Sequence, residues 1–89
     1  MKFNGQVCSF DKNDLYWELH IPIPPAVFEK LSYEAQDKRV VCTLNGTFSF
    51  HCAMLPKSTF HYILLNKAIC KKLNLHLNDD VEVELVKDE

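Results

Sequence analysis

The chain has 89 residues, of which 47% are hydrophobic and 11% are aromatic, and its formal net charge is -2 at pH 7. This length fits a single domain over residues 1–89, and the apolar content argues against a disordered chain. The slight acidic excess argues against a general nucleic-acid binder, because duplex binding depends on basic residues that neutralise phosphates.

The sequence contains no segment of the roughly 20 apolar residues that a membrane helix needs. Its first residues, MKFNGQVCSF, lack the apolar core of a signal peptide. We therefore expect a cytoplasmic protein that does not contact a membrane. In a reducing compartment its four cysteines should remain free thiols that pack as small hydrophobic side chains, namely Cys8, Cys42, Cys52 and Cys70.

Two strands are predicted at the start of the chain. Residues 2–10 alternate loosely, with Phe3, Gly5 and Val7 on one face. Residues 15–21 alternate clearly, with Trp17 on the apolar face and His20 on the polar face. The polar segment DKND between them predicts a hairpin with a loop of about four residues.

The proline-rich segment PIPPAVFEKL predicts the end of the second strand and the start of a helix. Pro22 should end the strand, and Pro24 and Pro25 suit the first turn of a helix, where a missing N–H has no partner to lose. The core-facing side chains of this helix are then expected to be Val27, Phe28 and Leu31.

The segment RVVCTLNGTFSFHCAML predicts a hairpin closed by Asn45-Gly46, because both residues tolerate the positive φ of a type I′ turn. The side chains expected on its apolar face are Val40, Cys42, Leu44, Phe48, Phe50, Cys52 and Met54. His51 and Cys52 are adjacent in a strand and should point to opposite faces, so they cannot both ligate one ion without a bulge.

A turn at PKST (56–59) and a strand over residues 60–65 should follow. Asn66 is expected to cap a helix over residues 67–73, and Asn74 to end it in the left-handed conformation. The last strand, residues 81–86, should bury Val81, Val83 and Leu85 and expose Glu82 and Glu84. The total is six short strands and two short helices, which favours a mainly β fold built as a small barrel.

Metal and catalytic sites find little support in the spacing of residues. The four cysteines and four histidines include no CxxC, CxH or HxxxH pair, so we expect no metal site and no cofactor. Cys42 and Cys52 can approach each other across the hairpin, but apolar surroundings raise the pKa of a thiol and reduce its reactivity. The sequence also contains no nucleophile elbow or glycine-rich phosphate loop, so we expect no enzymatic activity.

Basic residues provide the candidate ligand-binding site. Lys67, Lys71 and Lys72 lie on the second predicted helix, where the like charges at i, i+4 cost a few tenths of a kcal/mol. That arrangement is typical of a solvated face near acidic neighbours such as Glu82 and Glu84, or of a contact with an anion. Arg39, the single arginine, precedes a strand and can pair with a carboxylate at the barrel rim.

The order of three segments resembles a known family. WELHIP (17–22), then RVVCTLNGTFSF, then YILLNKAICKKLNLHLNDDVEVEL is similar to a bacterial and archaeal domain of unknown function. That domain occurs alone or fused ahead of YdeI/OmpD-associated domains of the bacteriocin-protection type. The resemblance implies a six-stranded double-split β-barrel, AbrB-like in architecture and capped by two helices, and no known activity. This chain departs from the family in having Asn74 and Asn78 where glycine is usual, and Lys71 where arginine is usual.

Three functions stay open at this point. The first is a non-enzymatic binding or interaction module, a monomer or weak homodimer that contacts a small anionic ligand or a protein through Arg39, Lys67, Lys71 and Lys72. The second is an AbrB-like DNA-binding regulator, which needs a dimer and a continuous basic face. The third is a small enzyme or metal protein.

Overall fold

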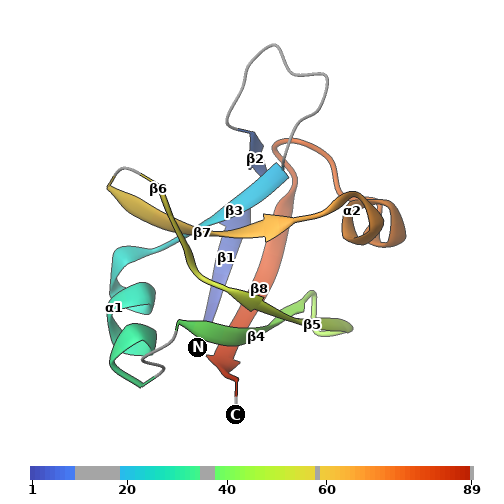
Figure 1. Cartoon of the computed structure of the whole chain (residues 1–89). Coiled ribbons are helices and arrows are strands. Elements are labelled where there is room, and N and C mark those ends of the chain that lie inside the picture. Colours follow the sequence, from blue (N-terminus) through green and yellow to red (C-terminus); the bar gives the residue numbers. More distant parts are fainter. Residues whose placement is uncertain (10–18, 35–37, 58, 89) are drawn as a thin grey trace.

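The computed structural model describes residues 1–9, 19–34, 38–57 and 59–88, which form eight strands and two helices (Figure 1). The strands are β1 (Lys2–Gln6), β2 (Cys8–Ser9), β3 (Leu19–Ile23), β4 (Arg39–Leu44), β5 (Phe48–Ala53), β6 (Leu55–Lys57), β7 (Phe60–Leu65) and β8 (Asp80–Lys87). The helices are α1 (Pro25–Glu34) and α2 (Lys67–Leu73). The prediction of a mainly β fold with two short helices is therefore confirmed. The predicted DKND turn and the position of Trp17 lie outside the described residues.

The strands form two antiparallel sheets of four strands each. One sheet has the order β1-β8-β4-β5 and the other β2-β3-β7-β6. Because β1 runs on into β2 and β5 runs on into β6, the two sheets are joined along both edges. Figure 1 shows the two sheets crossing, with α1 and α2 at opposite sides. Corners of this kind arise where a strand bends and changes sheet.

The chain passes from one sheet to the other at two points, and each point is a single buried residue, Val7 or Met54. Val7 is fully buried, its N–H donates to the carbonyl of Asp79 over 2.9 Å, and its carbonyl accepts from the N–H of Asn78 over 2.8 Å. Met54 is also buried, and its N–H donates to the carbonyl of Lys38 over 2.9 Å. Bonds to loop residues therefore replace bonds to a neighbouring strand at these two points.

The predicted number of six strands is wrong for two reasons. The first predicted strand breaks at Val7 into β1 and β2, and an additional strand, β6, follows Met54 and occupies part of the predicted PKST turn. The strands form two open sheets rather than one closed barrel.

The Asn45-Gly46 hairpin has the predicted geometry. The φ angles are 52° at Asn45 and 69° at Gly46, and the N–H of Thr47 donates to the carbonyl of Leu44 over 3.1 Å. Leu44 pairs with Phe48 in the antiparallel register. Two consecutive positive φ angles identify a type I′ turn, whose twist matches that of the flanking strands.

Alternating side chains from both sheets build the core as predicted. The fully buried or nearly buried members on β4 and β8 are Val40, Cys42, Leu44, Val81, Val83 and Leu85. On β5 the apolar side chains are only partly buried and pack against this core, namely Phe48, Phe50 and Cys52. The predicted hairpin between the first two strands is confirmed by the pairs Cys8–His20 and Ser9–Leu19.

Two predictions about β3 are wrong. The strand continues through Pro22 to Ile23, where Pro22 lies opposite Tyr62 of β7. Proline is tolerated there because β2 pairs with β3 only at Leu19 and His20, so the missing N–H faces no strand. His20, expected on the polar face, is 3% exposed and lies against the rings of Phe60 and Tyr62. Aromatic side chains of the neighbouring strand β7 thus cover a side chain that strand alternation assigns to solvent.

Both helices begin where the sequence predicts. α1 starts at Pro25 and buries Val27 and Leu31, and it contacts β7 and β8. α2 starts after Asn66, whose side-chain oxygen accepts from the N–H of Ile69 over 2.8 Å. It ends at Asn74, which has φ 55° and ψ 47°, the left-handed conformation predicted for it.

Candidate functional site

Helix α2 presents the three predicted lysines to solvent. Its Ile69 and Leu73 pack into or against the core, which leaves Lys67, Lys71 and Lys72 exposed. The first turn carries no acidic residue, and Lys71 and Lys72 lie in the last turn. Two lysines at the C-terminal end interact favourably with the helix dipole, so they add positive potential without opposing the helix.

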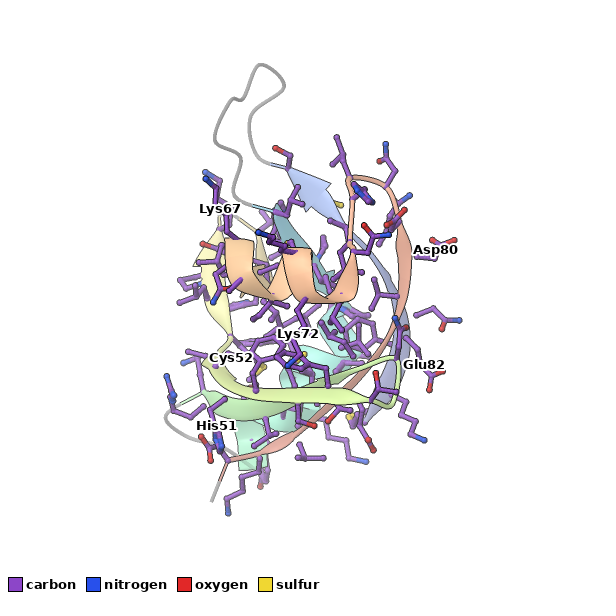
Figure 2. All side chains as sticks on the ribbon, turned by 90° about the vertical axis from the view of Figure 1, so that its right-hand side faces the viewer. His51, Cys52, Lys67, Lys72, Asp80 and Glu82 are labelled. Atoms are coloured by element: carbon purple, nitrogen blue, oxygen red, sulfur yellow. The ribbon has the colours of Figure 1, made fainter. Side chains whose placement is uncertain are left out.

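Lys72 connects α2 to the edge strand β5. Its Nζ lies 5.1 Å from the centroid of the Phe48 ring, a cation–π distance. Phe48 in turn packs beside Phe50, with ring centroids 5.9 Å apart. Figure 2 looks onto this side of the molecule, with Lys67 at the left-hand end of α2 and Lys72 below the helix, toward β5. The lysine face and the aromatic edge of β5 therefore form one surface.

The acidic neighbours expected for these lysines do not pair with them. Glu82 and Glu84 belong to β8, which lies between β1 and β4. Figure 2 places Glu82 on the far side of the view from Lys67. Within residues 1–9, 19–34, 38–57 and 59–88, neither glutamate forms an ion pair with a lysine of α2.

Arg39 lies apart from the lysines. It is exposed at the start of β4, opposite Ala53, whereas the Lys72 contact is at Phe48, five positions along β5. At about 3.4 Å per residue these points are about 17 Å apart. The three lysines therefore lie together on α2, whereas Arg39, the fourth residue of the predicted site, lies apart from them.

A pair of thiols lies near Arg39. All four described cysteines are free, and Cys42 and Cys52 are diagonal neighbours on the apolar face of the hairpin. Hydrogen bonding with Cys52 and burial raise the pKa of Cys42 well above its usual range. Hydrogen bonding from Cys42 lowers the pKa of Cys52, against the effect of burial, and the positive charge of Arg39 adds to the lowering.

The expectation that apolar surroundings raise the pKa of every thiol is therefore wrong for Cys52, whose pKa is lowered. Burial does raise the pKa of Cys8 and of Cys70, as expected for apolar surroundings. The signal for the exception was already in the alternation of the hairpin, which placed Cys42 and Cys52 on one face. The effect of one thiol on the other depends on the register, which the alternation does not supply.

His51 lies on the opposite face from Cys52, as predicted. Its Nδ1 is 3.1 Å from a carboxylate oxygen of Asp88, and the His51 side chain is 67% exposed. On this face the hydroxyl groups of the cross-strand neighbours Thr43 and Ser49 form a hydrogen bond, with their oxygens 2.7 Å apart. Within the described residues no group of three or more His, Cys, Asp or Glu side chains is placed to hold a metal ion.

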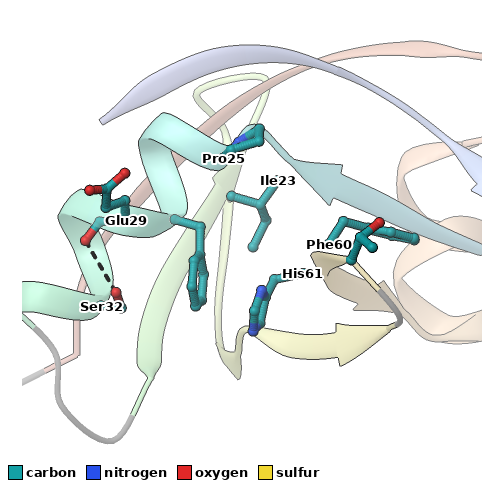
Figure 3. Close-up of a pocket in the computed structure, with 8 residues that line it drawn as sticks. Ile23, Pro25, Glu29, Ser32, Phe60 and His61 are labelled. Carbon is teal, nitrogen blue, oxygen red and sulfur yellow. Dashed lines mark hydrogen bonds between the residues drawn. The ribbon is translucent and has the colours of Figure 1, made fainter.

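A pocket that the sequence did not indicate lies between α1 and β7 (Figure 3). Its volume is about 350 Å³. The His61 ring stacks on Phe28 with centroids 3.6 Å apart and an interplanar angle of 11°. Glu29 and Ser32 line one side, where the Ser32 hydroxyl donates to the Glu29 carbonyl over 3.1 Å. The pocket offers aromatic faces with a few polar groups at the rim.

These features define a small, mainly β protein with two sheets, a lysine-bearing helix and a partly buried thiol pair. None of the helices in the described part of the chain is long and apolar enough to cross a membrane. A family model described as a domain of unknown function (DUF1905) matches residues 3–85, and the chain belongs to this family. No curated protein and no solved structure matches the chain. The family match confirms the resemblance to a domain of unknown function.

Proposed function

We propose that this domain is a non-enzymatic, cytoplasmic binding module that contacts an acidic segment of a protein partner through α2 and β5. The observation that carries the proposal is the exposed lysine face of α2, whose Lys71 and Lys72 have no acidic partner among the described residues. Exposed charges of one sign raise the rate and the specificity of association with a partner of the opposite sign.

The spacing of the basic groups favours an extended partner over a small ion. Lys67 and Lys72 are separated by five residues of helix, about 7.5 Å along its axis. Arg39 is about 17 Å from the Phe48 end of β5, and an extended peptide of about five residues covers that length. An acidic segment lying along β5 can therefore contact Lys72 at one end and Arg39 at the other.

Charge reversal tests the proposal. A fluorescent deca-glutamate peptide is titrated with the wild type and with the triple variant Lys67→Glu, Lys71→Glu, Lys72→Glu, at low and at physiological salt. We expect the variant to bind at least about tenfold more weakly, a loss of about 1.4 kcal/mol or more. Fluorescence anisotropy measures the dissociation constant, and circular dichroism checks that the variant folds.

A second triple variant of equal charge serves as the control. Lys2, Lys30 and Lys38 are exposed and lie away from α2, so their replacement by glutamate changes the net charge equally. Binding of the peptide should weaken far less than in the α2 variant. An equal loss of affinity in both variants would show that only net charge matters and would contradict binding at the proposed surface.

The DNA-binding alternative is tested in the same series. A labelled DNA duplex replaces the peptide, and retardation in a gel at low salt by a dimeric protein would favour the AbrB-like function over ours. We also infer that the two joined sheets are a form of the double-split barrel. The inference is supported by the two changes of sheet at Val7 and Met54, one on each edge.

A further inference from the structure

The edge strands of the two described sheets differ in how they are protected against pairing with another chain. Edge strands usually carry lysine, other charges or proline, or they are very short. β1 carries Lys2, β6 carries Pro56 and Lys57, and β2 has two residues. β5 has six residues, FSFHCA, with no lysine, acidic residue or proline. β5 is therefore the edge that lacks these protections.

Hydrogen bonds beside β5 show which of its backbone groups face outward. The N–H of Met54 donates to the carbonyl of Lys38 over 2.9 Å, and this pair continues the register of β4 and β5 by one position. Directly opposite residues of antiparallel strands are hydrogen-bonded at every second pair, so the even-numbered residues of β5 bond to β4. The residues whose N–H and C=O groups point away from β4 are then Ser49, His51 and Ala53. Within the described part of the chain no strand pairs with this edge.

The inner face of this edge combines aromatic surface with positive charge. Phe48 and Phe50 are only partly buried, and Nζ of Lys72 lies 5.1 Å from the centroid of the Phe48 ring. Lys71 is exposed on the same helix. Figure 2 shows α2 above β5, with Lys72 between the helix and the strand. A chain that pairs with β5 would therefore run beside the lysines of α2.

We propose that the acidic partner segment binds as an additional antiparallel strand on the edge of β5, beside α2. The inference rests on the proposed function and specifies its binding mode. An added strand gains affinity from main-chain hydrogen bonds and specificity from alternate side chains, and antiparallel pairing is the more stable per residue. A second copy paired through β5 would bring its own lysine helix to the same face of the joined sheet. Like charges then oppose that pairing, which favours an acidic segment as the occupant.

Strand alternation defines which residues of the segment are acidic. Residues opposite Phe48 and Phe50 place their side chains on the inner face near Lys72, and their N–H groups point away from β5. Residues opposite Ser49 and His51 place their side chains on the outer face, and their N–H groups bond to β5. We therefore expect acidic side chains at every second position and a free backbone N–H at each position between them.

Backbone methylation of a peptide tests this arrangement. A fluorescent ten-residue peptide that alternates threonine and glutamate is titrated with the wild-type protein, and fluorescence anisotropy gives the dissociation constant. Two modified forms of equal charge carry N-methyl groups on either the three central threonines or the three central glutamates. We expect the threonine-methylated form to bind at least about tenfold more weakly than the glutamate-methylated form, because only the threonine N–H groups face β5.

A matched pair of protein variants tests the same edge. Ser49→Pro removes an outward N–H without removing a bond to β4, and Ser49→Ala keeps that N–H. Both variants lose the hydroxyl contact with Thr43, so they differ at the backbone. We expect Ser49→Pro to bind the unmodified peptide at least about fivefold more weakly than Ser49→Ala, with circular dichroism as the check on folding. In the wild type, binding should slow hydrogen exchange at the amides of Ser49, His51 and Ala53.

The outcomes separate this inference from the proposed function. Equal affinity for the two methylated peptides, with binding still lost in the triple lysine variant of α2, would overturn strand addition and leave the charged surface intact. Weaker binding of the glutamate-methylated form would indicate a parallel strand and would also overturn the inference. Failure to bind both the alternating peptide and deca-glutamate would contradict the proposed function itself. A dimer with protected β5 amides in the absence of peptide would show that a second copy occupies the edge.

Discussion

Gly5 is a point of close approach between β1 and Ile21 of the opposite sheet. A Cβ atom at this position would lie 2.6 Å from Cγ2 of Ile21 and 3.3 Å from Cγ2 of Val83. Ile21 and Val83 are both fully buried, and a β-branched side chain has little freedom to turn away. Glycine is therefore required here for the space between the sheets, and not for an unusual backbone angle.

We expect Gly5→Ala to lower the free energy of unfolding by about 1–3 kcal/mol, because the added methyl group overpacks the core. Urea denaturation followed by circular dichroism measures the change. Asn4→Ala, at the neighbouring exposed position of β1, is the control and should change stability by less than about 0.5 kcal/mol. Equal stability of Gly5→Ala and the wild type would contradict the close approach.

Helix α2 is short, and capping hydrogen bonds at both ends fix where it begins and ends. Asn66 accepts a hydrogen bond from the N–H of Ile69, and Asn74 allows the N–H of Leu75 to donate to the carbonyl of Cys70 over 2.9 Å. Leu75 is buried just beyond the helix, which ties the C-terminal cap to the core. The caps hold the lysine face in place over β5.

Removal of the N-cap should destabilise the domain measurably. We expect Asn66→Ala to cost about 1 kcal/mol, because it leaves the N–H of Ile69 without its acceptor. Thermal denaturation at fixed pH gives the difference. Asn66→Ser retains an acceptor oxygen and should recover most of the loss, so equal destabilisation by Ala and Ser would argue against a capping role.

The two sheets share their edges through Val7 and Met54, so neither sheet has a core of its own. Buried side chains from both sheets meet in one cluster, to which α1 adds Val27 and Leu31. A domain organised in this way should unfold in one cooperative step, because loss of one sheet exposes the inner face of the other.

Met54→Ala tests this cooperativity. Truncation of a buried methionine at the change of sheet should cost about 2–5 kcal/mol. Hydrogen exchange should then accelerate equally for the slowest amides of both sheets. The exposed apolar residue Leu77 offers the control Leu77→Ala, with little expected effect. Acceleration in one sheet alone would contradict a shared core.

Local chemistry was enough to predict the elements that depend on few neighbours. The Asn45-Gly46 turn and the caps at Asn66 and Asn74 follow from the backbone preferences of asparagine and glycine, and all three have the expected geometry. The buried faces of β4 and β8 follow from strand alternation. Such signals act over a few residues, so they can be read from the chain directly.

The remaining features depend on contacts between distant parts of the chain, and only the tertiary structure decided them. His20 is buried because Phe60 and Tyr62 cover it, and Arg39 is far from Lys72 because β5 separates their positions. The breaks at Val7 and Met54 depend on hydrogen bonds to Asp79, Asn78 and Lys38. Alternation assigns each side chain to one face of its strand. The surroundings of that side chain depend on what packs against this face, on the register between strands and on the hydrogen-bond partners available where a strand breaks.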